Sequence, residues 1–206
     1  MTRPHHREIP LPANERVRIV EQRVLADDWF VLKKNIFDYR HSNGRWQRLQ
    51  RETYDRGDGA ALLLFNRARG TVVLTRQFRF PAYANGLVDG MLVEACAGLL
   101  DNEAPEVAIR REVQEETGFA VRMPRKVFEA FMSPGSVTER LHFFVAEYEP
   151  GDRVGDGGGN AHEGEDIEVL ELPLERALAM IGRGEIQDGK TIMLLQHAAL
   201  VGLERL

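Results

Sequence analysis

Four of the six residues 111–116 are charged: Arg111 is followed by Glu112, Glu115 and Glu116. On a helix, residues three and four positions apart are neighbours, so these carboxylates can meet in space. Like charges brought together in this way repel each other, and a divalent cation would relieve the repulsion. Oxygen ligands suit Mg²⁺, which usually keeps several waters and binds substrate phosphates. The cluster therefore indicates metal-assisted phosphate chemistry, although a solvated run of charges is the simpler alternative.

The flanking residues predict the helix that must position these carboxylates. Pro105 suits the first turn of a helix, and Asn102 can cap the helix just before it. Gly118 suits the position at which the helix stops. We therefore expect a helix that begins near Pro105 and ends before Gly118.

The hydrophobic pattern of this helix places the glutamates unusually. At about 100° per residue, Glu112 and Glu116 lie on the same side as Ile109 and Val113. A solvated face would put the glutamates opposite the apolar residues. We expect the two carboxylates at the edge of the buried face, where they also lose water and a cation would stabilise them.

The stretch resembles the box of the Nudix hydrolase family, G-x5-E-x7-R-E-U-x-E-E-x-G-U, in which U is apolar. Glu103 fits the first glutamate, with seven residues between it and Arg111. The remaining positions are fitted by Arg111, Glu112, Val113, Glu115, Glu116, Gly118 and Phe119. One departure lies in the first loop, where only four residues separate Gly98 from Glu103, so Ala97 stands at the glycine position or the loop is one residue shorter.

The composition sets limits on the class of protein. The chain has 206 residues and a net charge of −5, which gives no general electrostatic attraction to nucleic acid. Its one cysteine, Cys96, excludes an internal disulfide and fits a reducing compartment. We expect no membrane helix and no signal peptide, because no apolar run is long enough, and the cytoplasm is the default location.

The rest of the chain predicts three parts. Residues 1–14 read as a flexible tail, 15–56 as a small antiparallel sheet with a hairpin turn at Asn43-Gly44, and 57–206 as the main domain. In the main domain we expect strands at 60–66, 71–75, 91–96, 121–132, 141–148 and 167–172, a loop at 81–90 and late helices at 174–182 and 191–206. The glycine-rich acidic segment 149–165 is expected to be a mobile loop. The predicted fold is α/β (α+β), an α/β/α sandwich with a mixed sheet, as the Nudix resemblance also implies.

Further motifs narrow the resemblance. They are YDRG at 54–57, RQFR at 76–79, EACAGLLDN at 94–102, SPGSVTE at 133–139, EDIEVLELP at 165–173 and DGKT at 188–191. These motifs, and the shortened loop, are similar to the branch of the Nudix family that hydrolyses GDP-mannose. The resemblance implies Mg²⁺-dependent hydrolysis that yields GMP and mannose 1-phosphate. The sequence leaves open whether Mn²⁺ can take the place of Mg²⁺. The alternatives are an ADP-ribose or ADP-sugar hydrolase and a non-catalytic module that binds a nucleotide sugar.

The resemblance also implies a set of site residues. Catalytic roles fall to Glu112, Glu115, Glu116 and Glu165, with Glu163 as the alternative loop acid. Metal ligands would be the Ala97 carbonyl, Glu112, Glu116, Glu139 and Glu165. Glu103, Arg111 and Gly118 would support the site. The substrate would be bound by Trp29, Gln50, Arg51, Glu52, Arg79, Ala97, Gly98, Leu99 and Lys190, with the N-terminal sheet reaching the site across a homodimer.

Without the resemblance, several of these residues have simpler explanations. Glu165 reads as a solvated loop acid, and Trp29 as a residue of strand packing. Arg79 and Lys190 read as surface cations. The resemblance is therefore what assigns them to a site.

Overall fold

The computed structural model describes residues 11–206, apart from the side chain of Glu163, so most of the expected tail at 1–14 lies outside it. The chain divides into two units. The first comprises the chain up to Asp58 together with Phe131–Arg140, and the second comprises Gly59–Ala130 and Leu141–Leu206. The inclusion of 131–140 in the first unit was not expected from the sequence.

The first unit holds a three-stranded antiparallel sheet in the order β1-β2-β3. Its strands are β1 (Val17–Asp27), β2 (Val31–Arg40) and β3 (Trp46–Asp55). The expected hairpin turn joins β2 to β3, and Gly44 supplies the left-handed φ of 83° that the turn requires.

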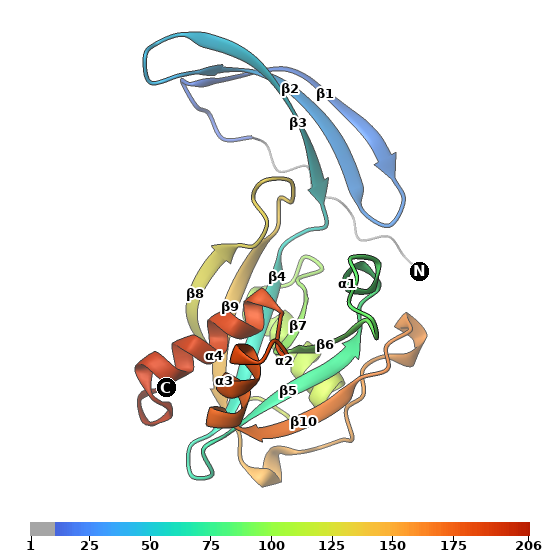
Figure 1. Ribbon diagram of the computed structural model, residues 1–206, viewed down its shortest axis with the longest axis vertical. Helices are drawn as coiled ribbons and strands as arrows, with labels where there is room; N and C mark the ends of the chain where they lie inside the picture. Colours follow the sequence, from blue (N-terminus) through green and yellow to red (C-terminus); the bar gives the residue numbers. More distant parts are fainter. Residues whose placement is uncertain (1–10) are drawn as a thin grey trace. The chain divides into compact units, whose positions relative to one another are not determined.

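The second unit is built around a mixed seven-stranded sheet (Figure 1). Its strands are β4 (Gly59–Asn66), β5 (Thr71–Phe78), β6 (Met91–Glu94), β7 (Cys96–Leu99), β8 (Arg125–Phe131), β9 (Arg140–Glu147) and β10 (Glu168–Pro173). Its helices are α1 (Phe80–Ala84), α2 (Pro105–Thr117), α3 (Leu174–Gly182) and α4 (Gly189–Val201). Single 3-10 turns, η1 (Pro150–Asp152), η2 (Ala161–Glu163) and η3 (Leu203–Arg205), complete it.

Strand β4 forks the sheet. It runs parallel to β9 along one side, from Gly59 to Phe65. On its other side it pairs with β5 only over Leu64–Asn66 and with β7 over Gly59–Leu62. The short strands β6 and β7 therefore fill the gap where β4 and β5 diverge, and this gap is where the RQFR and EACAG motifs come together.

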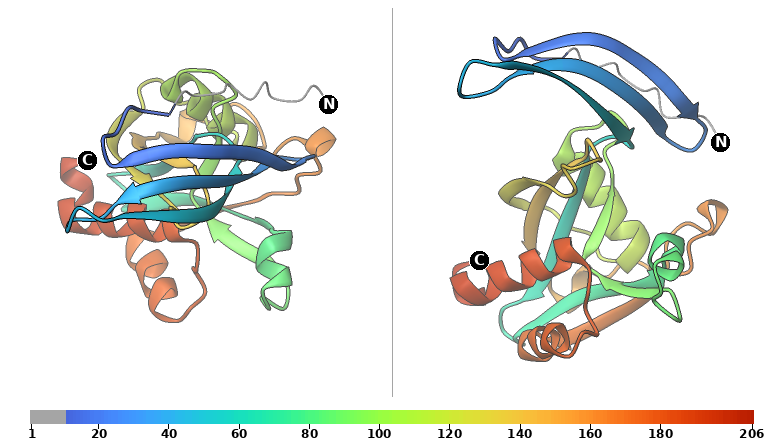
Figure 2. Two further views of the ribbon diagram at one scale, coloured as in Figure 1. Left: turned by 90° about the horizontal axis from the view of Figure 1, so that it is seen from above. Right: turned by 45° about the horizontal axis from the view of Figure 1, so that its top comes forward.

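Two layers of helices bury the sheet. All eight residues of β4 are buried, so both of its faces are covered. Helix α2 covers one face through Ile109 and Val113, which join a core cluster with Leu62 and Leu64. Helices α3 and α4 lie on the opposite face (Figures 1 and 2). The predicted α/β/α sandwich is thus confirmed. In the described part of the chain, no helix is both long and apolar enough to cross a membrane.

Four local expectations were wrong. The N-cap of α2 is Ala104, which has no capping side chain, and Asn102 instead takes a left-handed φ of 69° in the turn before it. The expected loop at 81–90 begins with α1, since Pro81 can occupy the first turn of a helix. The strand expected at 121–132 begins only at Arg125. Helix α4 begins at Gly189, because Asp188 caps it by accepting a 3.0 Å bond from Thr191 N, and ends at Val201 rather than 206.

Candidate active site

Helix α2 carries the acidic cluster as the sequence predicted. It runs from Pro105 to Thr117 and ends on Gly118, whose left-handed φ of 78° stops it. The side chain of Glu112 is 14% exposed and Glu116 is only 2% exposed, whereas the side chain of Glu115 is 45% exposed. Glu112 and Glu116 thus lie on the buried side of the helix, and Glu115 lies at its wet edge.

The backbone of β7 passes directly against Glu112. A Cβ atom added to Gly98 would lie 2.1 Å from Cδ of Glu112, far inside contact distance. Gly98 therefore makes the room for this carboxylate, although the general box places its glycine one position earlier. The shortened loop is absorbed after β7, where Asp101 and Asn102 both take left-handed φ angles, of 47° and 69°.

Arg111 gathers the acidic side chains around one guanidinium. Its Nη1 lies 2.9 Å from Oε1 of Glu112 and 3.4 Å from Oε2 of Glu115. Its Nε lies 3.4 Å from Oε2 of Glu103, the acid expected to support the site together with Arg111. Arg111 fixes Glu112 and offsets part of the negative charge of the cluster.

Glu116 is buried with one oxygen unpaired. In the described part of the chain, its Oε2 has no hydrogen-bond partner. Burial raises the pKa of Glu116 to about 8, against the hydrogen bond from the Cys96 thiol, while the charges of Glu112 and Glu165 raise it further. Burial likewise raises the pKa of Glu112 to about 7, against the attraction of Arg111. Two neighbouring carboxylates thus lose water together, which is costly without a cation.

These residues fit a hard divalent cation. The unpaired Oε2 of Glu116 and the adjacent Glu112 supply oxygen ligands, and a cation would compensate their repulsion. Within residues 11–206, no three acidic, histidine or cysteine side chains converge closely enough to hold an ion by themselves. Oxygen ligands of this kind suit Mg²⁺, which keeps waters and binds substrate phosphates.

The loop that carries Glu165 is anchored to α2. The amides of Gly158 and Gly159 donate to the carbonyls of Glu116 and Glu115, at 2.9 and 3.1 Å. These carbonyls belong to the last turn of the helix, which has no partners of its own for them. The middle part of the expected loop at 149–165 is thus hydrogen-bonded to the end of the helix.

Beyond this anchor, Glu165 closes a small ring. Its Oε2 accepts a 2.8 Å bond from the amide of Asn160, and the side chain is half-buried. Its charge raises the pKa of both Glu112 and Glu116, so the three carboxylates lie within electrostatic reach. The side chain of the alternative acid, Glu163, lies outside the described part of the structure.

Arg79 and Lys190 lie around one buried carboxylate, Glu94, which sequence reasoning did not select. Arg79 Nε lies 2.7 Å from Oε2 of Glu94, and Lys190 Nζ lies 2.5 Å from Oε1. Glu94 is 3% exposed and ends β6, opposite Thr75 of β5. In the sequence Glu94 opens the EACAGLLDN motif and ends an apolar strand, but an acid at a strand end also describes many surface residues.

The remaining residues of the expected site in this unit lie on β7. Ala97 pairs with Ala61, and Leu99 pairs with Gly59, in the antiparallel register of β4 and β7. Ala97 follows the buried Cys96 and precedes Gly98 on the strand. The backbone of β7 thus runs beside the acidic side of α2.

Five expected site residues belong to the first unit. Trp29 lies in the turn between β1 and β2 and is 70% exposed. Gln50, Arg51 and Glu52 follow one another on β3, an edge strand of its sheet, so Arg51 faces away from the other two. Glu139 is buried near Arg56, whose Nε lies 3.5 Å from Oε1 of the carboxylate.

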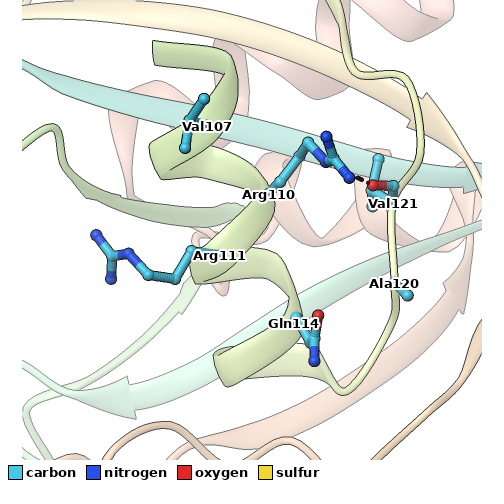
Figure 3. Close-up of a pocket in the computed structure, with 6 residues that line it drawn as sticks. All are labelled: Val107, Arg110, Arg111, Gln114, Ala120 and Val121. Carbon is cyan, nitrogen blue, oxygen red and sulfur yellow. Dashed lines mark hydrogen bonds between the residues drawn. The ribbon is translucent and has the colours of Figure 1, made fainter. Parts of the chain in front are cut away.

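A shallow cavity on the outer side of α2 is separate from this chemistry (Figure 3). It is lined by Val107, Arg110, Arg111, Gln114, Ala120 and Val121. Arg110 reaches across it and donates from Nε to the carbonyl of Val121 at 2.9 Å. Apart from Arg111, no residue of the candidate site lines it.

The forked mixed sheet, with an acidic helix packed against a glycine of β7, defines a Nudix domain. The chain belongs to the Nudix hydrolase family. A family model described as "NUDIX domain" matches residues 55–195. A second, described as "GDP-mannose pyrophosphatase NudK N-terminal domain", matches residues 16–54. The family resemblance predicted from the sequence is confirmed.

The curated relatives cover nearly the whole chain. A protein of Pectobacterium atrosepticum named GDP-mannose pyrophosphatase is 60% identical over 186 residues, which are 90% of this chain and 95% of the relative. Proteins of the same name from Yersinia enterocolitica and Enterobacter sp. are 54% and 53% identical over 188 residues. In both cases the match covers 91% of this chain and 97% of the relative.

Proposed function

We propose that the protein hydrolyses GDP-mannose to GMP and mannose 1-phosphate, with Mg²⁺ bound at the acidic side of α2. The observation that carries the chemistry is Glu116, a buried carboxylate with an unpaired oxygen beside Glu112. The choice of substrate rests on relatives that carry the name GDP-mannose pyrophosphatase at 53–60% identity. Both match along about nine-tenths of the chain, so the N-terminal sheet is included.

The reaction is the hydrolysis of a diphosphate bond. The water oxygen forms a bond to one phosphorus, the bridging P–O bond breaks, and the protons of the water pass to a base and then to solvent. When bound, Mg²⁺ would neutralise negative charge on the diphosphate, which is the main demand of such a transfer. Glu112, Glu116 and the Ala97 carbonyl would hold the ion.

Among the acids, Glu165 is our candidate for the base that receives the proton of the attacking water. It lies on the anchored loop, within electrostatic reach of Glu112 and Glu116. Its carboxylate is held by the amide of Asn160. Glu115, at the wet edge of α2, would orient the ligands or bind a further ion. Arg111 would keep Glu112 in place through their 2.9 Å contact.

The two ends of the substrate require different residues. We propose that Arg79 contacts the diphosphate, with Gly98 and Leu99 lining the same wall, and that Lys190 serves the sugar-phosphate end. Recognition of guanine is assigned to Trp29, Gln50 and Glu52, because Arg51 points to the other face of β3. An aromatic ring can stack on a base, and a carboxylate can accept from the amino and imino groups of guanine.

A homodimer is part of the proposal. The edge strand β1 exposes Ile19, Val20, Val24 and Leu25, each between 39% and 54%. A three-stranded sheet needs a hydrophobic face to be stable, and a partner would cover such a face. We propose that the N-terminal sheet packs against a second subunit and helps to form its nucleoside pocket. We also place the enzyme in the cytoplasm, where its one buried thiol stays reduced.

A phosphate-release assay with added phosphatase tests the substrate. The purified protein is given GDP-mannose, GDP-glucose, ADP-ribose and ADP-glucose, each with Mg²⁺ and with a chelator. We expect the highest kcat/KM for GDP-mannose and no turnover with the chelator. Preference for ADP-ribose would replace GDP-mannose as substrate while keeping the chemistry.

The same assay separates an enzyme from a binding module. A module that only binds nucleotide sugars would show no turnover with any substrate. Its buried pair Glu112 and Glu116 would then cost stability without a use. The variant Glu116→Gln serves as the inactive reference, so that contaminating phosphatases are recognised.

A further inference from the structure

Glu94 is the centre of a buried ionic network. Each of its carboxylate oxygens pairs with a different cation. Oε2 lies 2.7 Å from Nε of Arg79, and Oε1 lies 2.5 Å from Nζ of Lys190. Lys190 also lies 3.0 Å from Oδ1 of Asp188, the residue that caps α4. The network thus joins β6, the end of β5 and the start of α4 at the fork of the sheet.

The backbone around Glu94 is fixed independently of its side chain. The Glu94 carbonyl accepts a 3.2 Å bond from the Thr75 hydroxyl. The next amide, of Ala95, donates to the Thr191 hydroxyl at 2.6 Å. The carboxylate therefore projects from a rigid base, three residues before Ala97 of the candidate site.

The pairing leaves most of Arg79 available. Only Nε is engaged by Glu94, and within residues 11–206 the terminal nitrogens of the guanidinium make no hydrogen bond. The side chain of Arg79 is 39% exposed, whereas that of Lys190 is 13% exposed. Arg79 is also close enough to Glu116 for its charge to lower the pKa of that carboxyl. A guanidinium held by Nε presents its outer nitrogens as a fixed fork, which suits phosphate oxygens.

Stability alone does not explain such a network. Burying an ion group costs desolvation, and packed apolar side chains of similar size are often as stable or more so. Arg79 and Lys190 together carry two positive charges, and Glu94 and Asp188 balance them. The arrangement therefore adds no net charge, but it sets the position and direction of both cations.

We propose that Glu94 is a positioning residue that holds Arg79 and Lys190 in one wall facing the substrate diphosphate. The inference rests on the proposed function for the presence of a diphosphate, but not on the identity of its base or sugar. Glu94 touches neither substrate nor metal in this role. It acts through the two cations. Because Arg79 is already ordered in the folded protein, the entropy cost of ordering it does not weaken substrate binding.

The variant Glu94→Gln tests the role, because it keeps the shape but loses the charge that holds both cations. We expect KM for GDP-mannose to rise about tenfold or more, with kcat within about threefold of wild type. Mn²⁺ binding without nucleotide, measured by titration calorimetry, should be unchanged, since Glu112 and Glu116 are left in place. A general structural defect would weaken Mn²⁺ binding as well, and that result would overturn the proposal.

The matched control is Glu171→Gln. Glu171 pairs with Arg69 at 2.9 Å near the other end of β5 and β10, far along the strands from Arg79. The Glu171→Gln substitution should leave KM for GDP-mannose unchanged. A lower KM in Glu94→Gln would mean that Glu94 competes with the diphosphate for Arg79, which contradicts a positioning role. An unchanged KM would contradict it equally.

Arg79→Lys provides a second test should Glu94→Gln not fold. It keeps the positive charge on a partly exposed side chain, but one ammonium cannot bind Glu94 and also present a fork. We expect a similar rise in KM, and wild-type KM in this variant would overturn the proposal. If wild type prefers another nucleotide sugar, the proposed substrate fails, and the same comparison is made on the preferred one.

Discussion

Glu116→Gln removes the most buried carboxylate of α2 while keeping its shape, and we expect it to stabilise the metal-free protein at alkaline pH. Burial raises the pKa of Glu116 in the folded state to about 8, from an ordinary value of 4.5. Between these two values the folded protein binds more protons than the unfolded chain. The free energy of unfolding therefore falls as pH rises through this window.

The magnitude follows from the difference between the two pKa values. Ionisation of Glu116 lowers the free energy of unfolding by at most about 5 kcal/mol above pH 8, and by about 1 kcal/mol or less at pH 5. Glu112 and Glu116 raise each other's pKa, so removing one charge changes the cost of the other. We expect a gain of about 2–4 kcal/mol at pH 8.5, or roughly 5–15 °C in Tm for a chain of this size.

The assay is thermal and urea unfolding in chelator at pH 5 and pH 8.5. Glu106→Gln is the control, because Glu106 is an exposed acid in the first turn of the same helix. It should bring no gain at either pH. Saturating Mg²⁺ should stabilise the wild type more than Glu116→Gln, whose kcat should be at least about a hundredfold lower. Equal or lower stability of Glu116→Gln at pH 8.5 would refute the view that this carboxylate destabilises the metal-free protein.

Three further predictions concern Gly98 of β7, the two loop acids and the oligomeric state. Gly98→Ala should fold but lower kcat by about tenfold or more, because a Cβ atom 2.1 Å from Cδ must displace Glu112; turnover at the wild-type rate would show that the carboxylate moves freely. Glu165→Gln should lower kcat much more than it raises KM, whereas Glu163→Gln should do little, and the reverse outcome would move the role to Glu163. Sedimentation at micromolar concentration should show a dimer, and a fully active monomer would count against an N-terminal sheet that completes its partner's pocket.

Local rules were enough to predict α2 and its acidic side. Pro105 and Gly118 marked its ends, and the shared side of Glu112 and Val113 placed the carboxylate at the buried edge. These signals act within a few turns of helix, so no long-range contact can override them easily. The strands of the central sheet were likewise visible as compact apolar runs.

The features that were missed depend on contacts distant in sequence. Glu94 became recognisable only when β5 and α4 brought Arg79 and Lys190 to it, the latter from 96 positions along the chain. The anchoring of Gly158 could not be predicted from the glycine-rich composition of the loop, which indicates a flexible backbone. It is fixed because the carbonyls at the end of α2 require donors, and this loop supplies them.

The anchored loop also limits where the chain can change in length. A Cβ atom on Gly157 would lie 2.6 Å from the Glu116 carbonyl oxygen, so this residue and its neighbours are held in register with the helix. An insertion before Asp152 leaves that register intact, whereas one between Val154 and Gly159 would shift Glu165 relative to α2, and one within 160–164 would open the ring that the Asn160 amide closes on Glu165. Successful grafting of longer loops should therefore be confined to the stretch before Asp152.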